Sequence, residues 1–462
     1  MPLTTTRVLG FFLLLASACC FAQGPCPTAN STASTTILPR SGDLVCLVPQ
    51  VFGPGGLVGT DHGGPLLPTQ FGHAAHFSNS AVRSFAPLNA EIGTQLSQLP
   101  LTAPVSGFTF SFNPSLGVVS RQTESFGPVL TERADTIGRH KVFVGFAYQY
   151  FNFDKVDGVN LKNFGTVFQH EPEPELCTPV QIVPCIGGEP IFQRDIVATT
   201  NRIDLKVHQF TGVATFGVTD RFDLSVAVPI LDVRMGMSSS AVITSFESGF
   251  LVHQFAPPNS STQASFFQQN TASGIGDVIL RGKYEVLKGE KAGLALGLDV
   301  HFPTGDAENF LGSGAWGGRP FVTFSYGGRV SPHATFGYQR NSASILAGDV
   351  TTNSKAHLPD IVSYSAGVDA GLTRRLSASL DYIGQSLIDA KELASTTFVD
   401  FGGASHADLA TSTNTINQSY ISLGGKINPA GRLLVTANVL FQVNQAGLHS
   451  KPVPLIGLSY TF

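Results

Sequence analysis

The feature that most constrains this chain is a strict alternation of apolar with small or polar residues, in segments of about ten residues. One such segment alternates Leu294, Leu296, Leu298, Val300 and Phe302 with Ala295, Gly297, Asp299 and His301. A period of two places successive side chains on opposite faces of a β-strand. One apolar face and one small or polar face is typical of a strand with lipid on one side and a wet lumen on the other.

Twelve candidate strands with this pattern follow one another between residue 138 and the end of the chain. They lie near 139–153, 202–218, 221–235, 277–287, 292–303, 320–328, 333–346, 360–372, 376–388, 418–428, 432–444 and 453–462. The connections alternate between short turns and longer ones, which are long or irregular around 154–201, 236–276, 304–319, 347–359 and 389–417 and shorter at 445–452. A soluble β-sandwich would also alternate, but it has no reason to sort its loops by length.

Sorted loops are the rule in outer-membrane barrels, which have short periplasmic turns and long extracellular loops. We therefore predict an all-β fold, an antiparallel transmembrane β-barrel of about twelve strands over residues 138–462. Past residue 22 the sequence has no apolar run long enough to cross a bilayer as a helix. A membrane protein without such helices must be a closed barrel, because only helices and barrels satisfy every backbone group in lipid.

Composition excludes two other classes of protein. Only 13% of the residues are charged while 42% are apolar, which argues against a disordered chain. The 28 Lys and Arg residues against 32 Asp and Glu residues leave a net charge of −4. Nucleic-acid binding needs a concentrated basic face, so nucleic acid is not an expected partner.

The first 22 residues have the features of a secretory signal peptide. Arg7 precedes an apolar stretch from Val8 to Phe21, and the small residue Ala22 follows. This stretch is too short for a transmembrane helix, so we predict export with cleavage after Ala22. Together with the barrel pattern, this prediction places the protein in the outer membrane of a Gram-negative envelope.

Residues 23–105 form an irregular N-terminal segment, rich in Gly, Pro and Thr. Apolar residues at helical spacing, followed by Pro100, predict one short amphipathic helix near 84–99. This segment could lie in the periplasm or fold into the lumen as a plug. Residues 106–137 read as a hairpin and linker, and the barrel would have fourteen strands if the hairpin at 107–119 joined the wall.

Four cysteines follow the predicted cleavage site: Cys26, Cys46, Cys177 and Cys185. An exported chain enters an oxidising compartment, so this even number of cysteines predicts two disulfides. Three pairings are possible, of which we favour the nearest-neighbour pairs, Cys26 with Cys46 and Cys177 with Cys185. A metal site is the alternative, but no CxxC motif accompanies these cysteines.

The final segment ends on an aromatic residue. Leu458, Tyr460 and Phe462 share one face of the last predicted strand. This arrangement resembles the C-terminal signal by which bacterial outer-membrane barrels are recognised for assembly. The expected partners are therefore outer-membrane lipid and the barrel-assembly machinery.

Two sequence motifs carry a family resemblance. The stretch 274–284 reads Gly-Ile-Gly-Asp-Val-Ile-Leu-Arg-Gly-Lys-Tyr, and 297–306 reads Gly-Leu-Asp-Val-His-Phe-Pro-Thr-Gly-Asp. Together they are similar to the pattern of the outer-membrane barrel family associated with the meta pathway of phenol degradation. The resemblance covers roughly 138–462 and implies a transporter that passes small hydrophobic or aromatic compounds.

Charged residues within the predicted strands are the candidate pore-lining residues. An Arg or Lys that faces lipid near the bilayer midplane costs about 2–4 kcal/mol, so we expect these side chains to point into the lumen. The set consists of Arg281, Lys283, Glu285, Asp299 and His301, with a second row of Asp204, Lys206 and His208. They could form a ladder of salt bridges that fills the lumen, or a constriction that selects solutes.

Catalytic and metal-binding patterns are weak. The sequence has no G-x-S-x-G motif, and Ser405 and His406 near Asp400 lie in a stretch crowded with hydroxyl residues. His62, His73 and His76 are loop histidines, and the acidic groups 171–175 and 306–308 lack the ligand number of a defined cation site. We therefore expect a passive channel without enzyme activity, cofactor or metal. The alternatives are a non-conducting surface barrel that acts in adhesion or, less favoured, an outer-membrane hydrolase.

Overall fold

The computed structural model describes a discontinuous set of residues, and every structural statement here refers to them. They are 26, 42–53, 57, 59–61, 77–100, 110–113, 118–121, 125–170, 185–186, 189–246, 253–255, 261–289, 291–350 and 353–462. The predicted signal peptide, the three histidines His62, His73 and His76, and the acidic group 171–175 lie outside the described residues.

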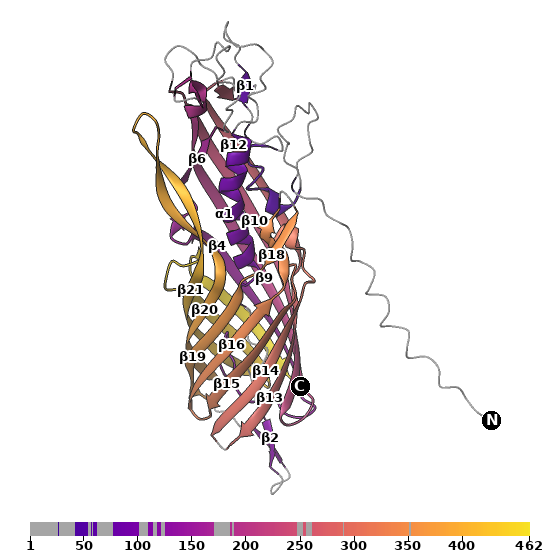
Figure 1. Cartoon of the computed structure of the whole chain (residues 1–462). Helices are drawn as coiled ribbons and strands as arrows, with labels where there is room; N and C mark the ends of the chain where they lie inside the picture. Colours follow the sequence, from indigo (N-terminus) through magenta and orange to yellow (C-terminus); the bar gives the residue numbers. More distant parts are fainter. Residues whose placement is uncertain are drawn as a thin grey trace, which may run out of the picture.

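Twelve antiparallel strands close into a barrel (Figure 1). In sheet order they are β4 (Val142–Val156), β9 (Ile196–Gly217), β10 (Phe222–Thr244), β13 (Val278–Lys288), β14 (Ala292–Phe302), β15 (Gly317–Tyr326), β16 (Val330–Asn341), β19 (Asp360–Thr373), β20 (Leu376–Val399), β21 (Ser405–Ala430), β22 (Leu433–Gln442) and β24 (Val453–Thr461). β24 pairs with β4, and β4 pairs with β9, so the ring is complete. The predicted all-β, twelve-stranded antiparallel barrel is confirmed.

The predicted hairpin does not extend this wall. β2 (Phe110–Asn113) and β3 (Val118–Arg121) pair only with each other, in a separate two-stranded sheet. In Figure 1 this hairpin lies beyond the lower rim of the barrel. The wall therefore has twelve strands rather than fourteen.

The two ends of the barrel differ as the loop lengths predict. Short turns join β9 to β10, β13 to β14, β15 to β16, β19 to β20 and β21 to β22, at the end where the chain also terminates. We call this the turn end and the opposite end the loop end. The other described elements are η1 (Leu44–Cys46), β1 (Gly59–Asp61), β5 (Val159–Asn160), β6 (Phe164–Gln169), β7 (Cys185–Ile186), β8 (Glu189–Pro190), η4 (Ile191–Arg194), β11 (His253–Phe255), β12 (Gln263–Ile275), η5 (Ala307–Asn309), β17 (Ala343–Asp349), β18 (Ser354–His357) and β23 (Leu448–Ser450).

Where the structure describes the connections around 236–276 and 389–417, which we expected to be long or irregular, most of their residues belong to strands. β10 continues to Thr244 and pairs with β12, while β20 and β21 continue as one long hairpin that projects from the loop end (Figure 1). Ser, Thr, Gln and Asn are frequent in these extensions, so the apolar alternation fades. The backbone ladder continues without it, because the inter-strand hydrogen bonds do not depend on which side chains face outward.

The outer face of the barrel is apolar around its girth. Phe146, Leu296 and Ile456 expose 53–65% of their surfaces there. The residues that alternate with such outward-facing residues along each strand point inward. Leu458, Tyr460 and Phe462 share the same outer face. A band of this kind requires a lipid environment, since a soluble protein rarely exposes so large an apolar patch.

The loop half of the barrel has an apolar interior, filled by a helix. α1 (Ser78–Leu96) is the helix expected near 84–99; it begins six residues earlier and buries Phe85, Leu88 and Ile92. It packs against β6, β17, β20 and β23, and inward-facing side chains of β9 and β10 belong to the same apolar core. Figure 1 shows α1 among the strands of the loop half. Within the described ranges, no helix is both long enough and apolar enough to cross a bilayer.

A disulfide fixes the segment that precedes α1. Cys26 and Cys46 are bonded, with their Cα atoms 5.4 Å apart, which confirms the first of the two favoured pairs. Cys46 lies in η1, and Leu44, Val45 and Cys46 are all buried in the same apolar core as α1. Cys177 lies outside the described residues, so its pairing with Cys185 stays a prediction.

Candidate functional site in the barrel lumen

A segment of irregular chain lies inside the turn half of the barrel, and we call residues 125–137 the lumenal strap. Inward-facing lysines donate hydrogen bonds to its backbone. Lys283 Nζ donates to the carbonyl oxygens of Arg133 (2.9 Å) and Asp135 (2.8 Å), and Lys426 Nζ donates to those of Phe126 (3.2 Å) and Pro128. The strap has no β-partner, so these lysines satisfy carbonyl groups that would otherwise be buried and unpaired.

Side chains of the strap form ion pairs with the wall. Glu132 contacts both Arg281 and Lys283, the latter at 3.0 Å, and Arg133 lies 3.5 Å from Asp369. All of these groups are buried. Breaking one such pair leaves an uncompensated buried charge, which typically costs about 3–5 kcal/mol. The strap is therefore held firmly across the lumen.

Two more wall residues contact the strap through one hydroxyl group. Thr131 Oγ1 donates to Asp381 Oδ1 at 3.0 Å and lies 2.9 Å from His333 Nε2. His333 Nε2 is itself 2.8 Å from the Asp381 carboxylate. These contacts come from β16 and β20, which are three and five strands along the ring from β13, the strand that carries Lys283.

Next to the strap, two arginines share one carboxylate. Arg281 donates from Nε and Nη2 to Asp299 at 2.6 and 2.8 Å, and Arg319 Nε donates to the same carboxylate at 2.9 Å. Both guanidinium groups lie over the ring of Phe321, at 4.9 and 5.7 Å from its centroid. The ring occupies the space that a Cβ atom at Gly297 would need, which explains why this strand position has no side chain.

Uncharged amides line the lumen at the level where α1 ends. Gln418 Nε2 donates to Gln95 Oε1 at 2.6 Å, Gln209 Nε2 donates to the Pro100 carbonyl at 3.2 Å, and Gln339 Nε2 donates to Gln98 Oε1 at 3.4 Å. The C-terminal end of the helix is thus tied to the wall by neutral hydrogen bonds. Such bonds are worth about 1 kcal/mol each, whereas removing one partner of a buried ion pair below them costs several times more.

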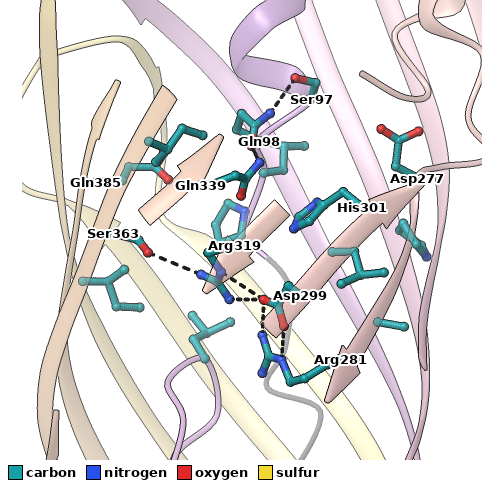
Figure 2. A pocket seen from close by; sticks show the side chains of 18 of the residues that line it. Ser97, Gln98, Asp277, Arg281, Asp299, His301, Arg319, Gln339, Ser363 and Gln385 are labelled. Atoms are coloured by element: carbon teal, nitrogen blue, oxygen red, sulfur yellow. Dashed lines mark hydrogen bonds and ion pairs between the residues drawn. The ribbon is translucent and has the colours of Figure 1, made fainter. Parts of the chain in front are cut away.

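Between the end of α1 and the lumenal strap lies a cavity of about 230 Å³. Figure 2 shows Ser97 and Gln98 on one side, Arg281, Asp299 and Arg319 on the other, and His301 between them. Apolar residues make up much of the rest of its lining: Leu96, Leu99, Pro100, Leu130, Ala227, Pro229, Leu231, Ile279, Leu311, Ile361 and Ile383. The cavity therefore combines these apolar side chains with hydroxyl, amide and charged groups, which come from the end of α1, from the lumenal strap and from several wall strands.

The structure divides the first predicted set of pore-lining residues between two levels. Arg281, Lys283, Glu285 and Asp299 are buried on the inner face. Arg281, Asp299 and His301 line the cavity, and His301 Nε2 has no hydrogen-bond partner among the described residues. Lys283 and Glu285 lie behind the strap, where Glu285 accepts a hydrogen bond from Thr136 at 3.2 Å.

The second predicted row is wrong. Asp204, Lys206 and His208 lie on the outer face of β9, while Leu205 and Val207 point inward against the core that contains α1. The prediction failed because it assumed that charged side chains point inward along the whole length of the strand. Beyond the lipid band the rule reverses, since the helix inside is apolar and the surroundings outside are polar.

Sequence reasoning missed the lumenal strap and its partners. Arg319, His333, Asp369, Asp381 and Lys426 were not singled out, although each is a charged or titratable residue within an alternating strand. The argument used for Arg281, that a charged residue in a lipid-crossing strand must point into the lumen, would also have found these residues. A further signal was the charge-rich stretch Glu132 to Asp135, which precedes the first strand and has no periodicity.

The two family motifs meet at a kink in the wall. Asp277 accepts hydrogen bonds from the backbone N–H groups of Gly305 (3.0 Å) and Ser313 (2.7 Å). Thr304 Oγ1 donates to the Gly276 carbonyl at 2.8 Å and accepts from the Val278 N–H at 2.9 Å. These bonds tie the β12–β13 junction to the loop after β14, so the motif residues hold the shape of the cavity wall.

Acidic groups outside the membrane-spanning strands have shifted pKa values. Burial, and after it the nearby carboxylates of Asp157 and Glu392, raise the pKa of Glu91 on α1 well above its usual range. Burial, Asp43 and Asp306 raise the pKa of Glu308 to about 7. Asp306 itself caps η5 by accepting from the Glu308 N–H, and within the described part of the chain no cluster of His, Cys, Asp and Glu has a metal-site arrangement.

The possible catalytic pair at the β20–β21 tip is part of a turn. His406 Nε2 lies 2.7 Å from Asp400, and Asp400 also accepts from the backbone N–H groups of Gly402 and Ala404 at 2.9 Å. These bonds account for the carboxylate as a turn-stabilising group. The contact therefore adds nothing to a hydrolase reading.

A closed antiparallel barrel with an apolar outer band and a polar lumen defines the chain as an outer-membrane β-barrel protein. Residues 193–386 match the family model described as "Putative MetA-pathway of phenol degradation". This match confirms the family resemblance over that part of the chain. A comparison with curated proteins finds no match.

Among solved structures, the barrel is similar to an outer-membrane channel from Pseudomonas putida F1, at 12% identity, covering 72% of this chain and 99% of that chain with a TM-score of 0.40. It is also similar to a Pseudomonas aeruginosa FadL homologue, at 11% identity, with 71% and 90% covered and a TM-score of 0.31. A third structure, the Ralstonia pickettii toluene transporter TbuX, has 11% identity, with 72% and 92% covered and a TM-score of 0.25.

Proposed function

We propose that this protein is a passive outer-membrane channel for small hydrophobic or aromatic solutes, which pass through the cavity between α1 and the lumenal strap. The observation that carries the proposal is the cavity of about 230 Å³, in which apolar atoms make up more than half of the lining surface. A dry apolar cavity of about 150 Å³ is large enough to bind benzene, whereas pockets for drug-sized ligands begin at about 300 Å³. The volume therefore suits a solute with a single aromatic ring.

The polar groups in the lining of the cavity support the same proposed function. His301 Nε2 lies in the cavity and offers a hydrogen bond that the described residues do not use. Arg281 and Arg319 pair with Asp299 and Glu132, so these two guanidinium groups do not present an unpaired positive charge to the cavity. An apolar solute with one polar substituent could bury its ring and still pair that substituent.

A cavity-filling substitution tests the proposal. Ile279→Trp places a larger side chain in the cavity lining and should reduce uptake of phenol or toluene into proteoliposomes by at least severalfold. Ile427→Trp, at a residue 52% exposed on the outer face, is the matched control and should leave uptake unchanged. Equal uptake by folded wild type and Ile279→Trp would contradict passage through this cavity.

A second function has one observation in its favour. Because α1 fills the loop half and the strap crosses the turn half, the barrel could be a non-conducting surface protein whose long β20–β21 hairpin acts in adhesion. Planar-bilayer conductance and liposome swelling, with and without residues 23–105, separate the two functions. If neither folded protein conducts ions or causes swelling, the result would support the non-conducting surface function.

The remaining parts of the proposal concern export and assembly. We infer that residues 1–22 are a cleaved signal peptide, that residues 23–105 are a plug for the barrel and that the chain has no enzyme activity. Phe462, with Tyr460 and Leu458, is proposed as the assembly signal. Substitution of Phe462 with Ser should lower the yield of heat-modifiable barrel in outer membranes, and an unchanged yield would remove this role.

A further inference from the structure

Four basic side chains gather on the outer face of the barrel near the loop end. Lys162 follows β5, Arg202 and Lys206 lie on β9, and Arg234 lies on β10. We call them the outer basic patch. The side chains of Arg202 and Arg234 are 56% and 57% exposed, so these groups face the surroundings of the barrel and not the lumen.

The strand register places this patch immediately beyond the apolar band. One cross-strand row on the outer face consists of Tyr148, Phe210, Ile230 and Ile275. The next row toward the loop end consists of Tyr150, His208, Asp232 and Ser273, and the row after it of Asn152, Lys206, Arg234 and Thr271. The outer face thus changes from apolar to basic within two rows, with Tyr148 hydrogen-bonded to His208 at 2.9 Å at the boundary.

The height of this boundary fits the edge of a bilayer. From Gly217 at the turn end to His208, β9 rises about 23 Å along the barrel axis, at about 3.4 Å per residue and a tilt of roughly 40°. The apolar band of outer-membrane barrels is about 25 Å tall, with aromatic residues at its edges. Lys206 and Arg234 therefore lie at the level of the lipid headgroups of the leaflet at the loop end.

The charges of the patch leave a positive surplus. Asp204 pairs with Lys162 at 2.7 Å and with Arg202 at 2.9 Å, and Asp232 pairs with Arg234 at 2.6 Å. Four positive groups against two negative groups give a net charge of +2. A phosphate monoester carries about −1.5 to −2 charges at neutral pH, which matches this surplus.

We propose that the outer basic patch binds a phosphate group of a phosphorylated glycolipid in the outer leaflet. Arg234 presents a planar fork of N–H donors suited to phosphate oxygens, and Lys206, its direct cross-strand neighbour, supplies a second positive charge. The acyl chains of the same lipid lie along the apolar row of Phe210, Ile230 and Ile275, two rows toward the turn end. This continuous apolar surface distinguishes a lipid phosphate from a free anion.

Lipid binding to the purified full-length chain tests the proposal. The probe is diphosphoryl lipid A, titrated into protein in non-ionic detergent and counted by native mass spectrometry. Each Lys or Arg near an anionic membrane surface contributes about 1 kcal/mol, so Lys206→Ser/Arg234→Ser should weaken binding by about thirtyfold. Lys391→Ser is the matched control, since Lys391 is an exposed lysine on the β20 extension whose cross-strand neighbour is Thr413.

Three further measurements make the outcome decisive. Binding to the unmodified protein should weaken with salt and should be lost with a dephosphorylated lipid A, because the interaction is between exposed charges. The charge-preserving variant Lys206→Arg/Arg234→Lys should retain binding, which covers the case in which the serine variant does not fold. Equal binding of the dephosphorylated lipid, equal loss in Lys391→Ser, or competition by millimolar inorganic phosphate would each overturn the proposal.

Discussion

At the scale of single residues, the lumen of the turn half is organised by charges that are almost completely paired. Asp299 and Glu132 each pair with two basic side chains, and Asp299 accepts from both Arg281 and Arg319. The pairing explains how a barrel with so few charged residues can bury several of them. Replacing a buried ion pair with apolar residues is often neutral for stability, so the charges are better explained by a wet lumen than by stability.

Asp299→Asn is the sharpest test at this scale. The substitution keeps the shape of the side chain but leaves the buried guanidinium group of Arg281 and the partly buried one of Arg319 with one carboxylate fewer. We expect the free energy of unfolding to fall by about 3–5 kcal/mol, measured by urea titration in lipid vesicles. The matched control is Asp204→Asn on the outer face, in an exposed pair worth at most about 1 kcal/mol. Similar losses in the two variants would contradict the difference in burial.

At the scale of elements, much of the barrel could be predicted and its contents could not. All twelve wall strands follow from the alternation, because lipid on one side imposes a periodic signal on every strand that crosses it. Asp204 and Lys206 were wrongly predicted to face the lumen. The apolar alternation shows which face of a strand meets lipid, and β9 continues beyond the lipid. The lumenal strap gave no periodic signal, since its conformation depends on tertiary hydrogen bonds from Lys283 and Lys426.

The candidate site was predictable to the same limited extent. Arg281, Asp299 and His301 were found because charged residues in a lipid-crossing strand must face inward. The opposing side of the cavity, Leu96 to Pro100, comes from the N-terminal segment. Its position in the lumen depends on how the helix packs against distant strands, and no local pattern reports such packing.

The docking of α1 should depend on pH through Glu91. Its pKa is raised in the folded state, so the folded protein holds this proton more tightly than the unfolded chain does. The associated stability is fully present below the ordinary Glu value of about 4.3 and is lost as pH rises toward the folded-state pKa. Glu91→Gln should remove this dependence and stabilise the docked helix at neutral pH.

Limited proteolysis of α1 across pH 4 to 8 measures this effect. The wild-type helix should become more accessible to a protease as pH rises, whereas Glu91→Gln should stay protected throughout. The control is Glu308→Gln, because the Glu308 pKa is also raised but Glu308 belongs to η5 and not to the helix. A wild-type cleavage rate that does not change with pH would remove Glu91 from this role.

At the scale of the whole molecule, the lumen contains two barriers of different character. The loop-end barrier is α1, held by apolar packing and neutral amide hydrogen bonds. The turn-end barrier is the lumenal strap, held by buried ion pairs and lysine-to-carbonyl bonds. The cavity lies between them, so a solute that crosses the membrane through the lumen must pass both.

Two barriers in series make a specific prediction for conductance. If only one of α1 and the lumenal strap is displaced, the other still limits the conductance of the whole lumen. Phe85→Ala/Leu88→Ala should undock α1, since the two losses from a buried core are about 3–5 and 2–5 kcal/mol. Lys283→Met/Lys426→Met should loosen the strap by removing its backbone bonds. Each double variant alone should raise conductance in planar bilayers only slightly, whereas the four substitutions together should raise it by more than the sum of the two. Full opening by the α1 variant alone would show that the strap does not obstruct the lumen, and only one barrier would then remain to control passage.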